Sequence, residues 1–97
     1  MGQERWNHAA CGYRSRYIFV SGSDCRWSAA SVERYDSWYD KWEALPNLKT
    51  ARSQHASCAM DEALYVFGGE DTDFNLLDSV ERLDLRGAQQ QQQLGWT

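Results

Sequence analysis

The stretch RWNHAAC at residues 5–11 recurs as RSQHASC at residues 52–58, with its arginine, histidine, alanine and cysteine kept at an offset of 47, from 5 to 52. YIFVSG at 17–22 falls on LYVFGG at 64–69 at the same offset. Matched segments in the same order are the mark of an internal repeat, and this repeat decides the fold before any single element is assigned.

A third pair of segments, SVERYD at 31–36 and SVERLD at 79–84, is offset by 48, from 31 to 79, which implies one extra residue in the preceding loop of the second unit. A period near 50 residues is longer than that of most solenoid repeats. The chain of 97 residues therefore holds two units, which we place at residues 3–50 and 51–97.

Each unit divides into four short segments rich in β-branched and aromatic residues, separated by Gly, Ser, Asp and Asn clusters that favour turns. We expect strands in the first unit at 8–13, 17–22, 31–36 and 41–45, and in the second at 55–60, 63–68, 79–85 and 94–97. A helix over 31–42 is the alternative, but its many β-branched and aromatic residues disfavour it.

Apolar side chains of both units are expected to form the core, among them Tyr35, Trp42, Val66 and Val80. The repeat also pairs two arginines, Arg34 with Arg82. We expect these arginines to make structural hydrogen bonds between the units rather than contacts with a ligand.

The two units resemble the kelch repeat. Tyr35 and Trp42 are separated by six residues in the first unit, as a Tyr and a Trp are in the kelch motif. Gly68 and Gly69 in the second unit form the diglycine that follows a hydrophobic strand. The resemblance implies an all-β fold of two four-stranded antiparallel kelch blades, a partial β-propeller.

The units depart from the motif at three places. Ser21 stands before Gly22 where the motif has its first glycine, which predicts a variant turn because a positive φ would be strained at serine. Leu83 stands where a tyrosine is expected. The spacing from there to Trp96 is stretched by a glutamine-rich segment, 87–94, which we expect to be a solvated loop.

The string SVERYD at 31–36 also resembles a strand common in BTB-kelch proteins, which are substrate receptors of cullin-based ubiquitin ligases. The resemblance implies a protein-binding module, as part of a ligase adaptor or of a cytoskeletal scaffold. The rival hypothesis is a propeller enzyme of the galactose-oxidase type, whose copper ligands have no identifiable counterparts here. We therefore expect no catalytic residues and no cofactor.

Charge and composition narrow the function further. A net charge of −4 supplies no basic field for binding nucleic acid. The longest apolar stretch, residues 17–20, is far shorter than the roughly 20 residues that span a bilayer, so we expect no membrane partner. Three cysteines, an odd number, favour a reducing compartment, the cytoplasm.

Two blades alone leave blade faces uncovered, because a propeller closes with about four to eight blades. The missing neighbours could come from a parent chain or from further copies of this one. We expect the sequence to be a piece of a larger propeller or to associate with itself.

Two patterns resemble metal sites but lack the geometry. His8 with Cys11, and His55 with Cys58, are spaced so that on a strand the two side chains point to opposite faces. Residues 71–76, DTDFNL, open like a calcium loop without the glycine and the final glutamate that such a loop needs. We expect neither zinc nor calcium.

Partner binding is expected at one end of the blades, where the loops 23–30 and 70–78 emerge beside the start of each first strand. Many kelch receptors use this face, and aromatic and arginine side chains dominate the energy of protein interfaces. We expect the partner to contact Arg26, Trp27 and Phe74, with Asp71, Asp73, Asn7 and Gln54 around them. The alternative is that Trp27 and Phe74 fold back onto their own blades.

Overall fold

The structure is a computed structural model that describes residues 8–23, 29–85 and 96–97. Within these ranges the chain forms seven strands, and no helix there is long and apolar enough to cross a bilayer. The strands are β1 (Ala9–Tyr13), β2 (Tyr17–Ser21), β3 (Val32–Asp36), β4 (Lys41–Leu45), β5 (Ala56–Met60), β6 (Ala63–Phe67) and β7 (Val80–Asp84).

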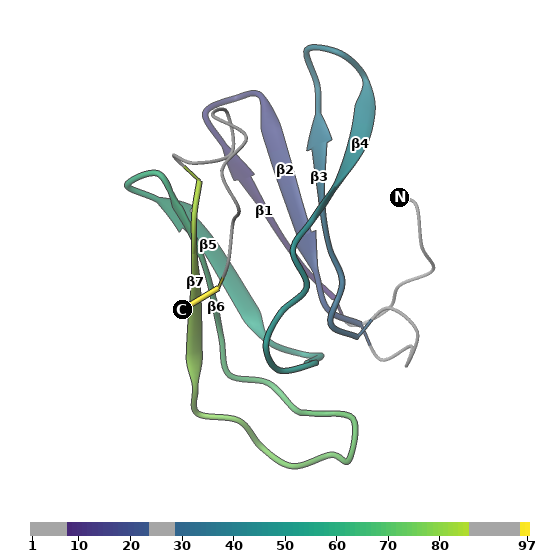
Figure 1. Ribbon diagram of the computed structural model, residues 1–97, viewed down its shortest axis with the longest axis vertical. Coiled ribbons are helices and arrows are strands. Elements are labelled where there is room, and N and C mark those ends of the chain that lie inside the picture. Colours follow the sequence, from purple (N-terminus) through teal and green to yellow (C-terminus); the bar gives the residue numbers. More distant parts are fainter. Residues whose placement is uncertain (1–7, 24–28, 86–95) are drawn as a thin grey trace.

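The strands form two antiparallel sheets, which we call blade 1 and blade 2 (Figure 1). Blade 1 has the order β1-β2-β3-β4, and blade 2 has the order β5-β6-β7. Blade 2 is extended at its edge by an antiparallel bridge between Leu83 and Trp96, which lies within the segment expected as its fourth strand. The all-β expectation is confirmed, and the helical alternative over 31–42 is wrong because β3 and part of β4 occupy it.

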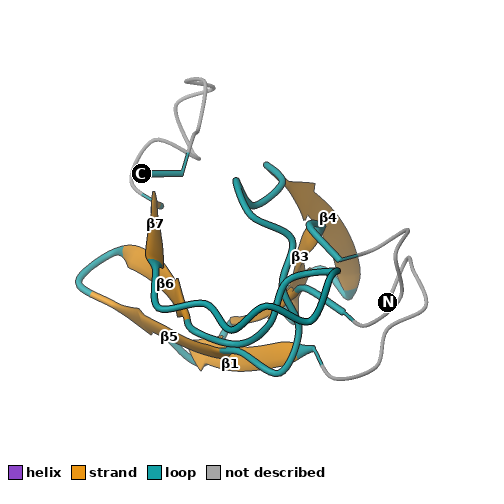
Figure 2. Ribbon diagram, turned by 90° about the horizontal axis from the view of Figure 1, so that it is seen from below, coloured by secondary structure: helices purple, strands orange, loops and turns teal. Residues whose placement is uncertain are grey.

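The two blades lie face to face and are closest at their first strands. Strands β1 and β5 contact each other directly, and the sheets diverge from there toward β4 and β7 (Figure 2). Blades of a propeller radiate from the axis in this way. The short strands, five residues each, suit such a blade.

The space between the blades is filled by one apolar cluster. Its buried members come from both sheets and from the segment between them: Phe19, Val32, Leu48, Leu64, Val66, Leu83 and Trp96. The indole Nε1 of Trp96 donates a hydrogen bond to the carbonyl of Pro46, 2.9 Å away, so the edge of blade 2 is held to the end of blade 1. This cluster is the core of the molecule.

The prediction of a core position is wrong for two of the four residues. Val66 is buried, but Trp42 and Val80 are exposed. Successive side chains of a strand point to opposite faces, and both residues lie on faces turned away from the core. Trp42 packs instead against its register partner Tyr35, with the ring centroids 5.2 Å apart.

The structure of the glycine turn in blade 1 shows that the expectation for Ser21 is wrong. Ser21 is not the counterpart of a glycine: it is the last residue of β2, and it is not among the residues with positive φ. Gly22 (φ 69°) matches Gly68 (φ 73°), because their amides donate to the equivalent carbonyls of Ser31 and Ser79 at 3.1 and 3.2 Å. The departure of unit 1 is therefore at the second glycine position, which residue 23 occupies as serine.

The shift arises in the first hairpin of each blade. In blade 1, β1 and β2 pair as far as Tyr13 and Tyr17, which leaves the turn 14–16 between them. In blade 2, Met60 pairs with Ala63, so the turn is only Asp61 and Glu62, whose positive φ angles of 50° and 59° are those of a tight two-residue hairpin. One residue fewer in this turn moves every side chain of β6 by one position relative to β2.

Candidate partner-binding face

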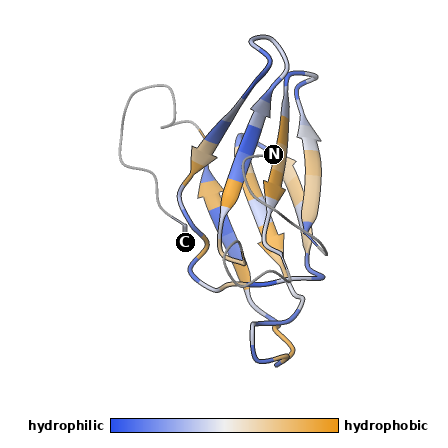
Figure 3. Cartoon of the chain, turned by 90° about the vertical axis from the view of Figure 1, so that its right-hand side faces the viewer, coloured by the Kyte–Doolittle hydropathy of each residue, from blue (hydrophilic) through white to orange (hydrophobic). Residues whose placement is uncertain are grey.

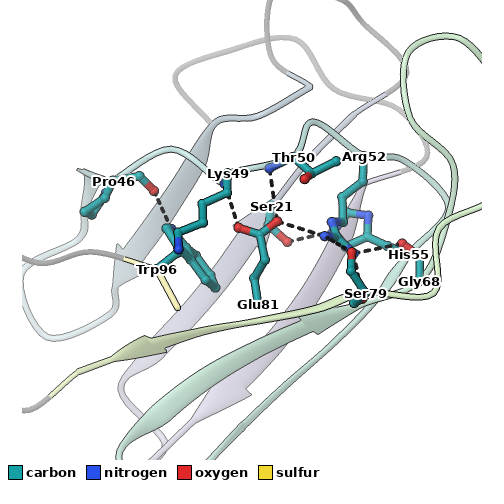
Figure 4. A network of polar contacts seen from close by, with 10 residues as sticks. All are labelled: Ser21, Pro46, Lys49, Thr50, Arg52, His55, Gly68, Ser79, Glu81 and Trp96. Atoms are coloured by element: carbon teal, nitrogen blue, oxygen red, sulfur yellow. Dashed lines mark hydrogen bonds and ion pairs between the residues drawn. The ribbon is translucent and has the colours of Figure 1, made fainter.

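A buried arginine ties the glycine turn of blade 2 to strand β7 (Figure 4). The guanidinium of Arg52 donates from Nη1 to the carbonyls of Gly68 and Ser79, both at 3.1 Å. Its Nη2 donates to the hydroxyl of Ser79 at 3.0 Å and to the carboxylate of Glu81 at 2.8 Å. Charge-assisted bonds of this kind are stronger than neutral ones, and they fix the start of the loop 68–79.

The same carboxylate holds the segment that connects the blades. Glu81 accepts hydrogen bonds from the backbone amides of Lys49 (2.6 Å) and Thr50 (3.2 Å), in addition to the one from Arg52. Three donors and an opposite charge satisfy this buried anion. Strand β7 and the connecting segment are thereby locked in one arrangement.

The expectation that Arg34 bonds between the blades is wrong, and the buried structural arginine is Arg52, whose side-chain bonds lie within its own unit. Arg34 forms an ion pair with Glu43 of the adjacent strand in its own blade and lies over the ring of Tyr17, 4.4 Å from its centroid. The bonds described for Arg82 are those of its backbone with Thr97. The repeat contained a signal for the Arg52–Glu81 pair, because Arg52 matches an arginine at 5 and Glu81 matches a glutamate at 33.

His55 joins the two blades at the base of this face. Its Nε2 lies 2.9 Å from the hydroxyl of Ser21, within hydrogen-bond distance. A Cβ added at Gly22 would lie 2.5 Å from Cε1 of the His55 ring. A Cβ added at Gly69 would lie 2.8 Å from the Cβ of His55. His55 therefore has a structural role, since its ring packs between two glycines and bonds to blade 1.

His55 also makes stability depend on pH. Burial lowers its pKa to about 4 from 6.5, with help from the positive charges of Arg52 and His8. The unfolded chain then binds the proton more readily, so the free energy of unfolding should fall as pH drops from about 6.5 to about 4 and level off below. We expect a loss on the order of 1–3 kcal/mol, less than the full shift because the side chain is only partly buried.

Urea denaturation at several pH values checks this expectation. The control is His55→Gln, which has no group that titrates in this window and should lose the step. Parallel stability curves for the two proteins between pH 6.5 and 4 would show that His55 is not the source.

The loop 68–79 is a prefolded projection of blade 2. Gly68 and Gly69 turn the chain out of β6 with φ angles of 73° and 85°. The carboxylate of Asp71 accepts bonds from the backbone amides of Asp73 and Asn75, both at 2.9 Å, and from the Asn75 side chain. These bonds lower the pKa of Asp71 below its usual value, chiefly through Asn75. The Asp71 carboxylate is thus engaged within its own loop.

Phe74 stands at the tip of this loop. It is 81% exposed, and its φ of 65° is unusual for a large side chain. Such backbone strain is found preferentially at functional positions. Phe74 does not fold back into its blade, so the alternative for this residue is wrong.

A cavity of about 400 Å³ lies beside Phe74, where the loops of the two blades meet. Blade 1 contributes Ser23 and Ala29, and the rest of the lining comes from blade 2: Arg52, Ser53, Glu70, Asp71, Thr72 and Phe74. The Arg52 charge is already neutralised by Glu81, so the carboxylates of Glu70 and Asp71 give the rim an acidic character. The cavity offers an apolar ring and negative charge together.

The structure places the remaining predicted contact residues as follows. Gln54 is exposed and follows Ser53, whose backbone pairs with that of Glu70 in the loop, so it lies at the same end of the blade. Asp73 is exposed beside Phe74. Asn7, Arg26 and Trp27 lie outside the described residues, although 26 and 27 fall in sequence between two lining residues of the cavity.

Metal ligation has no cluster to support it in the described ranges 8–23, 29–85 and 96–97, where no three His, Cys, Asp or Glu side chains gather closely enough. In blade 2 the expected separation of His55 and Cys58 is observed. His55 turns to Ser21, whereas Cys58 pairs in register with Tyr65 and is exposed.

Comparison with known proteins agrees with the architecture. The family model described as "Kelch motif" matches residues 51–92, which include all three strands of blade 2. The chain belongs to the kelch-repeat family. Blade 1 repeats the same strand order and the same glycine turn, so both halves of the described chain are kelch blades.

Relatives extend the match across both blades. The kelch chain is 35% identical over 68 residues to Kelch-like protein 38 of Mus musculus, covering 69% of this chain and 12% of the relative. It is 31% identical over 91 residues to alpha-scruin of Limulus polyphemus, covering 87% of this chain and 10% of the relative. Kelch repeat and BTB domain-containing protein 2 of Horsepox virus is 32% identical over 57 residues, 57% of this chain and 10% of the relative. The chain thus spans only about a tenth of the length of these relatives.

Proposed function

We propose that this pair of kelch blades binds a protein partner through the loop face, with Phe74 as the central contact. The observation that carries the proposal is the exposed ring of Phe74, held at a strained backbone position beside the cavity between the blades. A rigid, preformed aromatic anchor loses little entropy when a partner binds. The loop bonds of Asp71 supply that rigidity.

The chemistry of the face favours a partner segment that is basic and carries an apolar side chain. Glu70 and Asp71 line the cavity, and Asp73 is exposed next to Phe74. Complementary charge raises the rate and the specificity of association. An apolar side chain of the partner would enter the cavity against the Phe74 ring while its basic neighbours meet the acidic rim.

At the level of the whole protein, we propose a role in recognising protein substrates in the cytoplasm for a cullin-type ubiquitin ligase. The similarity of residues 31–36 to the BTB-kelch strand supports this proposal, as does a relative whose name includes a BTB domain. A cytoskeletal scaffold is the second form of the same binding function. The rival enzyme hypothesis has no supporting observation in the described residues.

Substitution of the anchor tests the binding face. We expect Phe74→Ala to weaken capture of partners by the 97-residue chain about 10- to 100-fold, the range of an aromatic hot spot. Trp38→Ala is the matched control, because Trp38 is also exposed but lies in the 37–40 turn at the opposite end of blade 1. Quantitative mass spectrometry of captured proteins measures both.

The double variant Arg26→Ala with Trp27→Ala extends the test to the predicted contacts of the first loop. Partners lost with both loop variants and kept with Trp38→Ala support the face. If the captured set is the same for Phe74→Ala as for the unaltered chain, the loop face is not the binding surface.

A further inference from the structure

The two blades enclose a second cavity, at the end of the molecule opposite the loop 68–79. The hairpin turns 14–16 and 61–62 lie at this end, whereas the loop projects from the other (Figure 1). The turns here are hydrophilic, and the hydrophobic residues are found along the strands (Figure 3). The cavity has a volume of about 230 Å³ and is lined by residues of both blades. It therefore lies within the blade pair and does not require a further blade.

The apolar part of the lining is a cluster of three aromatic rings from blade 1. The ring centroids of Tyr13 and Tyr17 lie 6.3 and 6.2 Å from that of Phe19, and the ring planes are tilted. Rings at these distances attract one another, so a further ring can join such a cluster. Leu85, which follows β7, adds an apolar contact from blade 2. Pockets for drug-sized ligands measure roughly 300–1,000 Å³, so this smaller cavity suits a group about as large as one aromatic side chain.

Arg34 supplies the polar part of the lining from within the blade pair. It pairs in register with Phe19 and Glu43, so these side chains share the face of blade 1 that is turned to the core. The Arg34 side chain is 13% exposed, and its Nη2 donates to the Glu43 carboxylate. Its Nε is buried and has no hydrogen-bond partner among the residues that the structure describes. Because a buried donor without an acceptor is costly, Arg34 favours a ligand that brings an acceptor.

An ion pair stands at the edge of the cavity. Arg14 and Glu62 line it from the two hairpin turns, 2.9 Å apart, with 62% and 43% of their side chains exposed. Exposed pairs contribute little to stability, so this one can open without unfolding the blades. The lining holds two arginines and one carboxylate, because Glu43 is not part of it. This excess of positive charge favours an anion, in contrast to the acidic rim of the loop face.

We propose that this cavity binds an aromatic carboxylate. The ring of the ligand packs against the three aromatic side chains, and its carboxylate accepts hydrogen bonds from Arg34 and Arg14. The ligand carboxylate takes the place of Glu62 beside Arg14. Small aromatic acids carry this chemistry, and so does the C-terminus of a chain that ends in phenylalanine. The site shares no residue with the loop face, so it does not depend on the partner-binding proposal.

Titration of the chain with phenylacetate tests the proposal, followed by nuclear magnetic resonance signals of the Arg34 Nε–Hε group and the Phe19 ring. Phenylacetamide is the neutral control. We expect phenylacetate to bind at least about tenfold more tightly, because hydrogen bonds between arginine and a carboxylate are roughly twice as strong as neutral ones. The peptide acetyl-Gly-Gly-Phe, with a free or an amidated C-terminus, distinguishes the two sources. Binding of the free-acid peptide assigns the site to chain ends, and binding of phenylacetate alone assigns it to small acids.

Three variants test the assigned contacts. Arg34→Lys keeps a charge beside Glu43 but lacks the planar fork, so it should weaken phenylacetate binding at least about tenfold, with the fold verified by circular dichroism. Glu62→Gln releases Arg14 and should strengthen binding about two- to fivefold, a gain that a damaged fold cannot produce. Asp73→Asn removes the same charge at the exposed loop face and should leave binding unchanged.

Each of three results would overturn the proposal. The first is the absence of shifts at the cavity with phenylacetate up to about 10 mM, beyond the weak affinity expected for so small a ligand. The second is equal binding of phenylacetamide, and the third is a Glu62→Gln chain that binds no more tightly than the unaltered one.

Discussion

Replacing Glu81 with glutamine is expected to lower the free energy of unfolding by about 3–5 kcal/mol, because removing one partner of a buried ion pair leaves the other charge uncompensated. The Arg52 side chain is fully buried, and its Nη2 lies 2.8 Å from the Glu81 carboxylate. Glutamine keeps the shape of the side chain, but it removes the charge and replaces one of the two accepting oxygens with an NH2 group that only donates. Urea denaturation at fixed protein concentration measures the loss.

The matched control is the ion pair between Arg14 and Glu62. It joins the two blades directly, at 2.9 Å, but both side chains are exposed. Exposed pairs contribute about 0–1 kcal/mol, so Glu62→Gln should lower the free energy of unfolding by less than 1 kcal/mol. Equal effects of the two substitutions would mean that Glu81 does not hold the blades together as described.

The second large effect is expected at the glycine turn of blade 1. A Cβ at Gly22 would lie 2.3 Å from the carbonyl oxygen of Arg52 and 2.5 Å from the ring of His55. Gly22→Ala should therefore combine the cost of a positive φ, about 1–2 kcal/mol, with about 1–3 kcal/mol for overpacking. We expect a total loss of about 2–5 kcal/mol in the free energy of unfolding.

Gly68→Ala separates the two costs. Gly68 has nearly the same φ as Gly22, but the nearest atom to its added Cβ, the Leu77 carbonyl oxygen, is 3.9 Å away. This variant should show only the backbone cost of about 1–2 kcal/mol. If denaturation finds Gly22→Ala no more damaging than Gly68→Ala, the close packing of blade 2 against the glycine turn of blade 1 is wrong.

The blade fold could be predicted from the repeat because matched segments 47 and 48 residues apart report strand order without any knowledge of contacts. The register of β6 could not be predicted from the repeat. All but one of the residues in YIFVSG and LYVFGG up to the glycines are apolar, so a shift of one position leaves the pattern unchanged. Only the two-residue turn at Asp61 and Glu62 reveals the shift.

The sequence also could not predict which apolar residues form the core. Trp42 and Trp96 are the same residue at equivalent positions, yet one is exposed and the other buried. Their difference depends on whether a blade packs behind them, which no local pattern encodes. The ion pair of Arg52 and Glu81, in contrast, had a signal in the repeated Arg and Glu of both units.

Only part of the candidate site could be predicted from the sequence. Phe74 could be singled out as an aromatic in a loop, but its outward position follows from the Asp71 bonds and a φ of 65°, which require coordinates. The sequence pattern of residues 71–76 had suggested only a calcium loop that lacks ligands. Its acidic residue instead builds a turn, a use of aspartate that is common at loop tips.

The packing of two kelch blades face to face is tested most directly by a nuclear Overhauser effect between the imidazole Hε1 of His55 and the Hα of Gly22. Gly22 follows strand β2 of blade 1 and His55 precedes strand β5 of blade 2, and a Cβ at Gly22 would lie 2.5 Å from Cε1 of that ring. We expect a strong cross-peak, with the ring proton titrating near pH 4. A missing cross-peak together with a His55 pKa near its ordinary 6.5 would contradict the arrangement of the two blades.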